Sequence, residues 1–430
     1  MSSTVPSVSA AILEERRQYY IDQYVRENTK TGELIAKNSP TLPGGTTRAV
    51  LVHEPFPLAF TGGRDCYVTS TDGHEYLDFV SEYCAGMLGH SHPDIQAAIQ
   101  KVASEGFTLG GANQYEGELA RRLCERFASM DGIRFANSGT EANTLAIATA
   151  LAYTGREKVL VFENGYHGGT LAFSSPGPLT LPHQFIYGNF NDIERTKSKI
   201  DIEIGVIVVE PLQFAGGLIT GNKDFLQFLR DEATRIGAVL LFDEVVTSRL
   251  LFGGMQSHFG ITPDMTTIGK HFGGGFSFGA FGGKRDIMDL FNPRSPRCIY
   301  HSGTWNNNSF SMAAGIVATK LLSPEALDRT SALGDQLRTR IGEIFESASP
   351  GLVKMYGWGS VVGVRFQGPQ ADKLRELYYF FLLSQRIYSG FRGFLALNIT
   401  HSQEHVDQLI SAVELFCSEV LPRMEPVARL

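Results

Sequence analysis

The middle of the chain alternates short, fully apolar runs with longer stretches of helical periodicity. The apolar runs lie at residues 159–162, 206–209 and 239–242, and the helical stretches lie at 117–129 and 141–153. A strand that is apolar on both sides must be covered on both faces, which is typical of a parallel sheet packed between helices. The middle of the chain is therefore predicted to form a large α/β domain.

The two ends of the chain have a different pattern. Residues 11–28 form a charged amphipathic stretch, and apolar positions alternate around Asp72-Gly73, which predicts a hairpin with this pair as its turn. Residues 353–366 have the pattern of paired strands, and 405–421 that of a final amphipathic helix. We expect these ends to form a smaller α+β domain. The predicted boundaries are 1–89 for the N-terminal arm and part of the small domain, 90–325 for the large domain and 326–430 for the rest of the small domain.

Composition and charge exclude several classes of function. With 43% hydrophobic and 19% charged residues, the chain has the mixture of an ordinary globular protein. The net charge is -7 and the chain has no run of basic residues, so we expect no nucleic-acid partner. No apolar stretch approaches the roughly 18 residues that suggest a membrane span, so we expect no membrane partner either.

Cysteine usage and the chain ends bear on the compartment. The five cysteines are scattered without a C-x-x-C pair, which points to a reducing compartment and predicts no metal site. The N-terminus lacks the basic and apolar regions of a signal peptide, so the cytoplasm is the expected location. The final tripeptide Ala428-Arg429-Leu430 resembles variants of a peroxisomal address, which leaves the peroxisome as an alternative.

A glycine between two hydroxyl residues marks a candidate phosphate site. Ser138, Gly139 and Thr140 stand where an apolar strand ends and a run of good helix formers begins. The first N–H groups of a helix have no partner within the helix, so such a start can bind a phosphate group. Ser138 could instead be a simple N-cap, and these residues alone do not decide between the two. The spacings of a P-loop and of a dinucleotide fingerprint are absent.

Two chemically active residues end apolar strands in the same region. Asp243 follows the run at 239–242, and Lys270 follows another apolar run at the entrance to a glycine-rich loop. The carboxyl ends of strands in an open α/β sheet line the ligand crevice. A buried carboxylate needs a positive partner, and a desolvated lysine amine is a nucleophile toward carbonyl carbon. The simpler alternatives are an N-cap or internal ion pair for Asp243 and a solvated Lys270.

Tyr166 adds an aromatic ring at the end of the strand near residue 160. It is flanked by glycines, so it can lie flat against a planar ring, or alternatively cover the core from a turn. A phosphate cradle, a stacking aromatic, a carboxylate for a cationic ring nitrogen and an imine-forming lysine together describe one ligand, pyridoxal 5'-phosphate (PLP). Asp243 would keep the ring nitrogen protonated, and Lys270 would hold the aldehyde as an imine and move a substrate proton.

The order and spacing of these motifs resemble those of the class III aminotransferases of PLP fold type I, from about residue 40 to the C-terminus. The resemblance implies the fold of that family, with a mostly parallel seven-stranded sheet between helices in a large domain and a smaller α+β domain from both termini. It implies that Lys270 and Asp243 are catalytic. The matching segments are residues 138–142, 166–168, 243–245, Lys270 and 301–304.

The resemblance also implies the cofactor contacts. Val245 would pack on the ring face opposite Tyr166, and Thr304 would reach the cofactor phosphate of the neighbouring subunit. The active unit would therefore be a homodimer with shared active sites. The residues implied to contact the cofactor are Ser138, Gly139, Thr140, Tyr166, His167, Glu210, Asp243, Val245, Lys270 and Thr304.

Within the class, the sequence is most similar to the glutamate-1-semialdehyde aminomutase branch, which also contains aminotransferases of aromatic β-amino acids. The surroundings of Arg48 resemble the arm of the β-phenylalanine aminotransferases, whose arginine there holds the substrate carboxylate, and Arg392 resembles their second carboxylate-binding arginine. The guanidinium fork suits this task because it grips a carboxylate in two places. A site for an aryl or alkyl side chain is expected to be lined by Val50, Leu51, Phe56 and Tyr83.

These features predict a PLP-dependent aminotransferase that moves an amino group from an aromatic or hydrophobic β-amino acid to an α-keto acid, such as 2-oxoglutarate or pyruvate, by a ping-pong route. An aminomutase or a racemase that uses the same Lys270 and Asp243 is the nearest alternative. A non-catalytic PLP-fold protein has no need of these two residues, and a nicotinamide oxidoreductase is disfavoured by the missing glycine fingerprint.

Overall fold

The computed structural model describes residues 7–174, 177–421 and 424–425. The chain divides into two compact units. The first unit comprises Met1–Tyr83, Gly89–His92 and Arg329–Leu430, and the second comprises Cys84–Leu88 and Pro93–Asp328. The C-terminal tripeptide that resembles a peroxisomal address lies outside the described residues.

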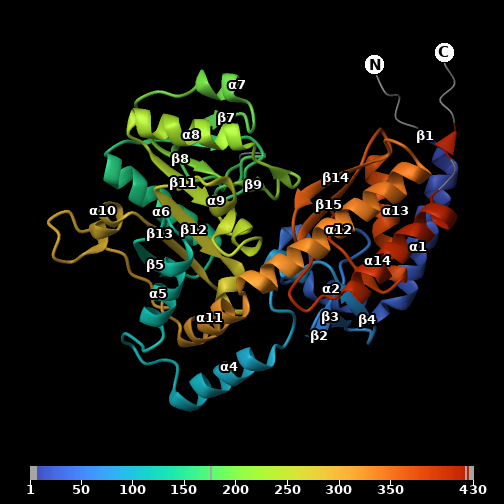
Figure 1. The fold of residues 1–430 in the computed structure, drawn as a ribbon. Coiled ribbons are helices and arrows are strands. Elements are labelled where there is room, and N and C mark those ends of the chain that lie inside the picture. The colour runs from blue at the N-terminus through green and yellow to red at the C-terminus, as the bar shows by residue number, and fades with distance from the viewer. Residues whose placement is uncertain (1–6, 175–176, 422–423, 426–430) are drawn as a thin grey trace. The chain divides into compact units, whose positions relative to one another are not determined.

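The second unit contains a seven-stranded sheet in the order β5-β13-β12-β11-β8-β6-β7 (Figure 1). Neighbouring strands are parallel except at β13, which is antiparallel to both β12 and β5. The predicted mostly parallel seven-stranded sheet is thereby confirmed. The strands are β5 (Gly132–Ala136), β6 (Lys158–Phe162), β7 (Gln184–Gly188), β8 (Ile204–Val209), β11 (Val239–Asp243), β12 (Met265–Gly269) and β13 (Gly279–Gly283).

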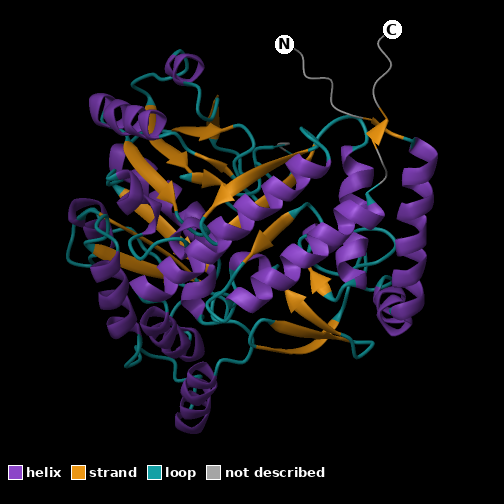
Figure 2. Ribbon diagram, turned by 45° about the vertical axis from the view of Figure 1, so that its right-hand side comes forward, coloured by secondary structure: helices purple, strands orange, loops and turns teal. Residues whose placement is uncertain are grey.

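Helices cover both faces of this sheet (Figure 2). On one face, α6 (Gly139–Thr154) packs with Met265 and Phe281 in one apolar cluster. On the other face, α5 (Glu116–Arg126) and α11 (Ser309–Leu321) pack with Ile268 and Ala280 in a second cluster. Adjacent strand residues point to opposite faces, so two separate cores account for the apolar runs without polar interruption. The other helices are α4 (Pro93–Glu105), α7 (Ile193–Lys197), α8 (Lys223–Ile236), α9 (Gly254–Phe259) and α10 (Arg285–Met288).

The first unit contains two smaller sheets, in the orders β16-β4-β3-β2 and β14-β15-β17. The predicted hairpin is β3–β4, whose strands are antiparallel, and Gly73 in its turn has the positive φ of 87° that glycine allows. Strand β16 pairs in parallel with β4, with Ile387 opposite Leu77, which joins a late segment of the chain to an early one. The strands are β2 (Phe60–Arg64), β3 (Tyr67–Ser70), β4 (Glu75–Asp78), β14 (Val353–Trp358), β15 (Val361–Phe366), β16 (Ile387–Tyr388) and β17 (Phe394–Ala396).

Helices at both ends of the chain pack around the core of the first unit. The predicted N-terminal helix is α1 (Ala10–Glu27), which packs against α13 (Ala371–Ser384). The predicted final helix is α14 (Gln403–Leu415), continued by a π-helical turn at Phe416–Val420. Helix α2 (Thr29–Asn38) was not predicted. Helix α12 (Pro324–Ala348) begins in the second unit and continues through the first.

Within the described ranges, no helix has the combination of length and apolar character that a membrane span requires.

Candidate active site

Asp243 is the last residue of β11, and its carboxylate is buried and held from several sides. Its Oδ2 atom accepts hydrogen bonds from His167 Nδ1 at 2.7 Å and from Asn143 Nδ2 at 2.8 Å. Its Oδ1 atom accepts from the backbone N–H of Val245 at 3.0 Å. The residue is only 4% exposed, and a buried carboxylate requires such partners.

His167 is the positive partner that a buried Asp243 needs. Burial disfavours the charged imidazole, but the hydrogen bond and the charge of Asp243 outweigh this effect, and the pKa of His167 is raised. The hydrogen bond from Nδ1 keeps the carboxylate ionised at the end of β11, and the raised pKa of His167 favours the protonated, positive ring behind it. An internal ion pair and a functional carboxylate are therefore compatible at this position.

Two residues of this network were missed by the sequence analysis. Asn143, on α6, donates to Asp243 and also to the backbone carbonyl of His167 at 3.0 Å. Thr267, on β12, donates from Oγ1 to Asn143 Oδ1 at 2.6 Å, which fixes the orientation of the amide. The available signal was an asparagine among Ala142, Ala146 and Ile147 on an apolar helix face, where a buried amide must have partners.

Lys270 directly follows β12, on the same edge of the sheet as Asp243. The two strands are parallel neighbours, and Asp243 lies opposite Thr267. Lys270 is half-buried and has a φ of 52°, in the left-handed region that residues with a Cβ atom rarely adopt. Such a conformation costs about 1–2 kcal/mol and is concentrated at functional sites. No pattern in the sequence signals it.

The start of α6 combines free helix amides with close packing. Ser138 is its N-cap, and the hydroxyl accepts from the N–H of Glu141 at 3.1 Å, so the predicted N-cap role is real. The amides of Gly139 and Thr140 precede the first intrahelical bond and can serve an anion. A Cβ atom at Gly139 would lie 2.8 Å from Val245, so only glycine allows this approach.

Tyr166 and Glu210 are linked through the backbone. The ring of Tyr166 is 48% exposed, and its N–H donates to Glu210 Oε1 at 2.9 Å. The other Glu210 oxygen accepts from the N–H of Phe214 at 3.2 Å. Burial is the main cause that raises the pKa of Glu210 to about 7, and the negative charge of Asp243 adds to it. Glu210 thus orders the loop that carries Tyr166.

Thr304 lies on an exposed loop of the second unit. The loop is anchored by His301, whose Nδ1 and backbone carbonyl accept from Arg134 at 3.2 and 3.0 Å. Asn306 accepts from Asn137 Nδ2 at 3.0 Å, next to the start of α6. Arg134, Asn137 and Asn306 were not predicted, since no motif relates positions so distant in the sequence.

The predicted substrate residues lie in the first unit. Arg48 forms an ion pair with Glu82, and its guanidinium carbon lies 4.9 Å from the ring centroid of Tyr83. The hydroxyl of Tyr83 donates to the carbonyl of Val50 at 3.3 Å. Burial raises the pKa of Tyr83, against the opposing positive charges of Arg48 and Arg392. Both arginines therefore lie close enough to Tyr83 for their charges to act on its phenol.

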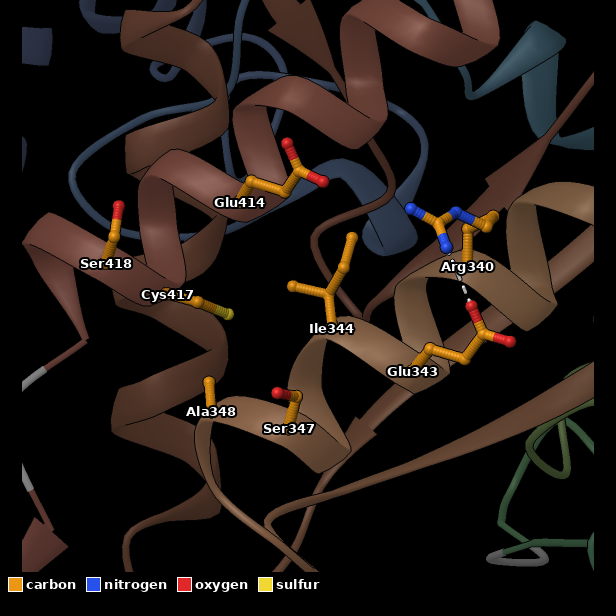
Figure 3. Close-up of a pocket in the computed structure, with 8 residues that line it drawn as sticks. All are labelled: Arg340, Glu343, Ile344, Ser347, Ala348, Glu414, Cys417 and Ser418. Carbon is orange, nitrogen blue, oxygen red and sulfur yellow. Dashed lines mark hydrogen bonds and ion pairs between the residues drawn. The ribbon is translucent and has the colours of Figure 1, made fainter.

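Two hollows of the first unit are not lined by any of the predicted site residues. One, of about 370 Å³, lies between α12 and the end of α14, with Ile344 and Cys417 among its lining residues (Figure 3). The other, of about 350 Å³, is lined in part by His53 and Phe391, whose rings stack with centroids 4.4 Å apart. Neither contains a group suited to amino transfer. Among the described residues, no group of three or more His, Cys, Asp and Glu side chains could hold a metal ion.

The chain resembles known proteins over nearly its whole length. The family model described as aminotransferase class-III matches residues 49–386. A β-phenylalanine transaminase of Variovorax paradoxus is 43% identical over 401 residues, which are 89% of this chain and 92% of the relative. The crystal structure of a β-phenylalanine aminotransferase from Variovorax paradoxus has a TM-score of 0.91 at 40% identity, covering 96% of this chain and 100% of that chain.

Other similar proteins include an aminomutase and a further transaminase. A glutamate-1-semialdehyde 2,1-aminomutase of Desulforudis audaxviator is 35% identical over 429 residues, covering 90% of this chain and 98% of the relative. A solved structure described as a transaminase with PLP bound has a TM-score of 0.86 at 28% identity, covering 92% of this chain and 98% of that chain. The predicted resemblance to both groups is confirmed.

Proposed function

The chain belongs to the class III aminotransferase family, and from that premise we propose that it transfers an amino group from an aromatic or hydrophobic β-amino acid to an α-keto acid. Enzymes of this family depend on PLP, and so does this one. The choice of donor class rests on one observation, the 43% identity with a β-phenylalanine transaminase over 89% of the chain. The proposed acceptor is 2-oxoglutarate or pyruvate.

The polar residues at the carboxyl edge of the large sheet fit this cofactor. Asp243 is a buried carboxylate with a cationic partner, which suits a group that must hold a proton on a ring nitrogen. The first amides of α6, with Ser138, Gly139 and Thr140, would hold the phosphate. When bound, PLP supplies an aldehyde carbon that takes up the amino group and a ring that withdraws electrons.

Apolar residues would hold the ring itself. Tyr166 presents a half-exposed aromatic face, and Val245 packs closely on Gly139. The two side chains would contact opposite faces of the ring and exclude water from it. His167 would act through Asp243, because its proton keeps that carboxylate negative in a buried place.

Lys270 is proposed to be the catalytic residue. Its amine Nζ would hold the cofactor aldehyde until the donor arrives, and would then carry the proton from the amino-bearing carbon of the substrate. The strained backbone at φ 52° and the position at the end of β12 support this role, since both direct the residue toward the edge where Asp243 ends its strand. Donor and acceptor would react in turn, which is a ping-pong route.

Arg48 and Arg392 are proposed to bind carboxylates. A β-amino acid has one carboxylate and an apolar side chain, whereas 2-oxoglutarate has two carboxylates. The same site must accept both, so the two arginines would share or exchange roles, with Tyr83 lining the apolar part. The charges of both arginines act on Tyr83, which supports their assignment to one recognition site.

We also propose that the active enzyme is a homodimer. Thr304 lies on an exposed loop that is anchored to β5 and to the residues before α6. An exposed hydroxyl on an ordered loop is available to the cofactor phosphate of a neighbouring subunit. Sedimentation of the wild-type enzyme would test the stoichiometry, and Thr304→Ala would weaken the binding of PLP if the assignment is right.

The decisive experiment is a screen of amino donors with and without an acceptor. β-Phenylalanine mixed with the PLP-loaded enzyme alone should change the visible absorbance once and then stop. Addition of 2-oxoglutarate or pyruvate should restore the absorbance and release the keto product continuously. Lys270→Ala is the control, because it lacks the amine that is proposed to hold the cofactor. Failure of every β-amino acid to react would refute the proposal.

An aminomutase is the second candidate, because a glutamate-1-semialdehyde aminomutase is 35% identical over 90% of the chain. A mutase returns the amino group to the same substrate molecule, so it needs no acceptor. Continuous turnover of glutamate-1-semialdehyde by the enzyme without a keto acid would establish this reaction in place of the proposed one.

A further inference from the structure

Four successive residues have left-handed backbone conformations, and the first three belong to the first unit. Ser81, Glu82, Tyr83 and Cys84 have φ angles of 45°, 50°, 52° and 74°. None is glycine, and each such residue costs about 1–2 kcal/mol relative to an ordinary conformation. Strain of this size persists only where the surroundings over-determine it, and it clusters at sites that bind ligands. We call residues 81–83 the left-handed turn.

Buried polar groups hold this turn in place. Asp78 is 2% exposed, and its Oδ1 accepts from the N–H groups of Val80 and Ser81 at 2.7 and 3.1 Å. The hydroxyl of Ser81 donates to the carbonyl of Ala396 at 2.9 Å and accepts from Asn398 Nδ2 at 3.2 Å. The backbone of the turn is therefore fixed, and the side chains that follow Ser81 are presented in a defined direction.

The turn presents a carboxylate and an aromatic ring to the same arginine. Glu82 Oε1 forms an ion pair with Arg48 Nη1, and the guanidinium carbon of Arg48 lies 4.9 Å from the ring centroid of Tyr83. The side chains of Arg48 and Glu82 are 43% and 60% exposed. A carboxylate and a stacked ring are also what an aromatic amino acid would offer to Arg48. If Arg48 binds the substrate carboxylate as proposed above, Glu82 occupies the position of that carboxylate.

We propose that Glu82 is a specificity-determining residue that competes with the substrate carboxylate for Arg48. The proposal rests on the proposed role of Arg48 in substrate binding. A ligand whose carboxylate binds Arg48 must displace Glu82, whereas an amine without a carboxylate pays no such penalty. Because an exposed ion pair contributes little, the penalty corresponds to a weakening of about two- to five-fold. Glu82 therefore reduces the preference of the enzyme for amino acids over amines that lack a carboxylate.

The test compares Glu82→Gln with wild type on two donors that share an aryl group. For β-phenylalanine, which has a carboxylate, KM should fall about two- to five-fold with kcat nearly unchanged. For 1-phenylethylamine, which has none, KM should not fall. Glu343→Gln is the matched control, because Glu343 and Arg340 form an exposed ion pair elsewhere in the first unit. This variant should leave both donors unaffected.

A second measurement requires no turnover. Calorimetric titration of the PLP-loaded enzyme with 3-phenylpropanoate, which has the carboxylate and ring but no amine, should give a tighter Kd in Glu82→Gln by the same factor. In the Arg48→Gln background the same substitution should have no effect, since the competition needs both partners. An unchanged or weaker Kd in Glu82→Gln would overturn the proposal.

The outcomes separate this inference from the proposed function. If wild type transfers amino groups from β-phenylalanine but Glu82→Gln does not lower its KM, the competition is refuted and the function stands. If no β-amino acid reacts but Glu82→Gln binds 3-phenylpropanoate more tightly, the function is refuted and the competition at Arg48 stands.

Discussion

The polar cluster around Asp243 and the charged cluster around Arg48 are built in opposite ways. Asp243 is 4% exposed, and its carboxylate oxygens accept bonds from a histidine, an asparagine and a backbone N–H. Arg48 and Glu82 are 43% and 60% exposed. A buried network in low dielectric is rigid and costly to disturb, whereas an exposed ion pair exchanges partners at little cost.

The contrast suggests a division of labour. The chemistry of a PLP enzyme needs the same charges in the same places for every substrate, which favours a buried, fully bonded cluster. Recognition of a monocarboxylate donor and a dicarboxylate acceptor by one enzyme needs groups that can change partners. Substitutions should therefore have large effects in the first cluster and graded effects in the second.

Lys270→Ala should have the largest effect. If Lys270 has the proposed role, loss of its amine removes the group that would hold the aldehyde and carry the substrate proton, so kcat/KM should fall by at least about a thousandfold. Steady-state assays with β-phenylalanine and 2-oxoglutarate measure this, and the visible absorbance of the PLP-loaded protein should change as well. Lys223→Ala, at the exposed start of α8, is the control. Retention of near-normal activity would rule out the assigned chemistry.

Asp243→Asn should be the next most damaging change. The amide has the shape of the carboxylate but no charge, so it could not perform the proposed task of holding a proton on the cofactor ring nitrogen, and kcat should fall about 100- to 10,000-fold. The pKa of His167 should also fall, because the charge that raises it is gone. Activity assays and NMR titration of the histidine check the two effects. If the variant keeps more than about a tenth of the activity, the buried Asp243 cluster is not more sensitive to substitution than the exposed Arg48 cluster.

Glu210→Gln tests burial through the pH dependence of stability. The pKa of Glu210 is raised from 4.5 to about 7, so the folded protein binds this proton more tightly than the unfolded chain does. The contribution of this proton to the free energy of unfolding is fully present below pH 4.5 and is lost as the pH rises through 7. From pH 5 to 8, the free energy of unfolding of wild type should fall by about 1–3 kcal/mol relative to the variant. Urea denaturation at several pH values measures the difference, and parallel curves would contradict it.

Arg392→Gln and Arg48→Gln should have intermediate, ligand-dependent effects. Loss of a two-point carboxylate contact should raise KM about 10- to 100-fold for the ligands that use it, with kcat little changed. Comparison of β-phenylalanine with 2-oxoglutarate shows which arginine serves which carboxylate. Equal, small effects on all donors and acceptors would remove both residues from substrate recognition.

Glu14→Gln should have the smallest effect and gives the baseline for an exposed charge. Hydrogen bonds from Arg17 and Lys373 lower the pKa of Glu14 to about 2, so its contribution is present above pH 4.5 and is lost as the pH falls toward 2. Because the side chain is 41% exposed, the variant should lose less than about 1 kcal/mol at pH 7. The difference in stability between wild type and the variant should become smaller in acid. Thermal unfolding at pH 7 and pH 3 measures this difference, and a larger difference at pH 3 would contradict the prediction.

The sequence pattern was sufficient to predict those features whose physical cause lies in neighbouring residues. The apolar runs predicted the sheet, the Asp-Gly pair predicted the β3–β4 hairpin, and strand ends predicted that Asp243 and Lys270 lie on one edge. The N-cap role of Ser138 likewise follows from the residues next to it. Each of these depends on a few neighbouring positions and a general rule of backbone geometry.

Other features depend on contacts that no neighbouring residue specifies. Asn143 reaches Asp243 across 100 positions, and Glu82 reaches Arg48 across 34. The positive φ of Lys270 and the left-handed turn go against the preference of their residue types, so tertiary packing must impose them. Hydrophobic periodicity and strand-end chemistry thus determine the layers of this protein and the kind of ligand it holds. The pairing of polar groups and the backbone strain at Lys270 and the left-handed turn are decided only when distant segments pack. Hydrogen bonds and ion pairs act over a few ångströms in space and not along the chain.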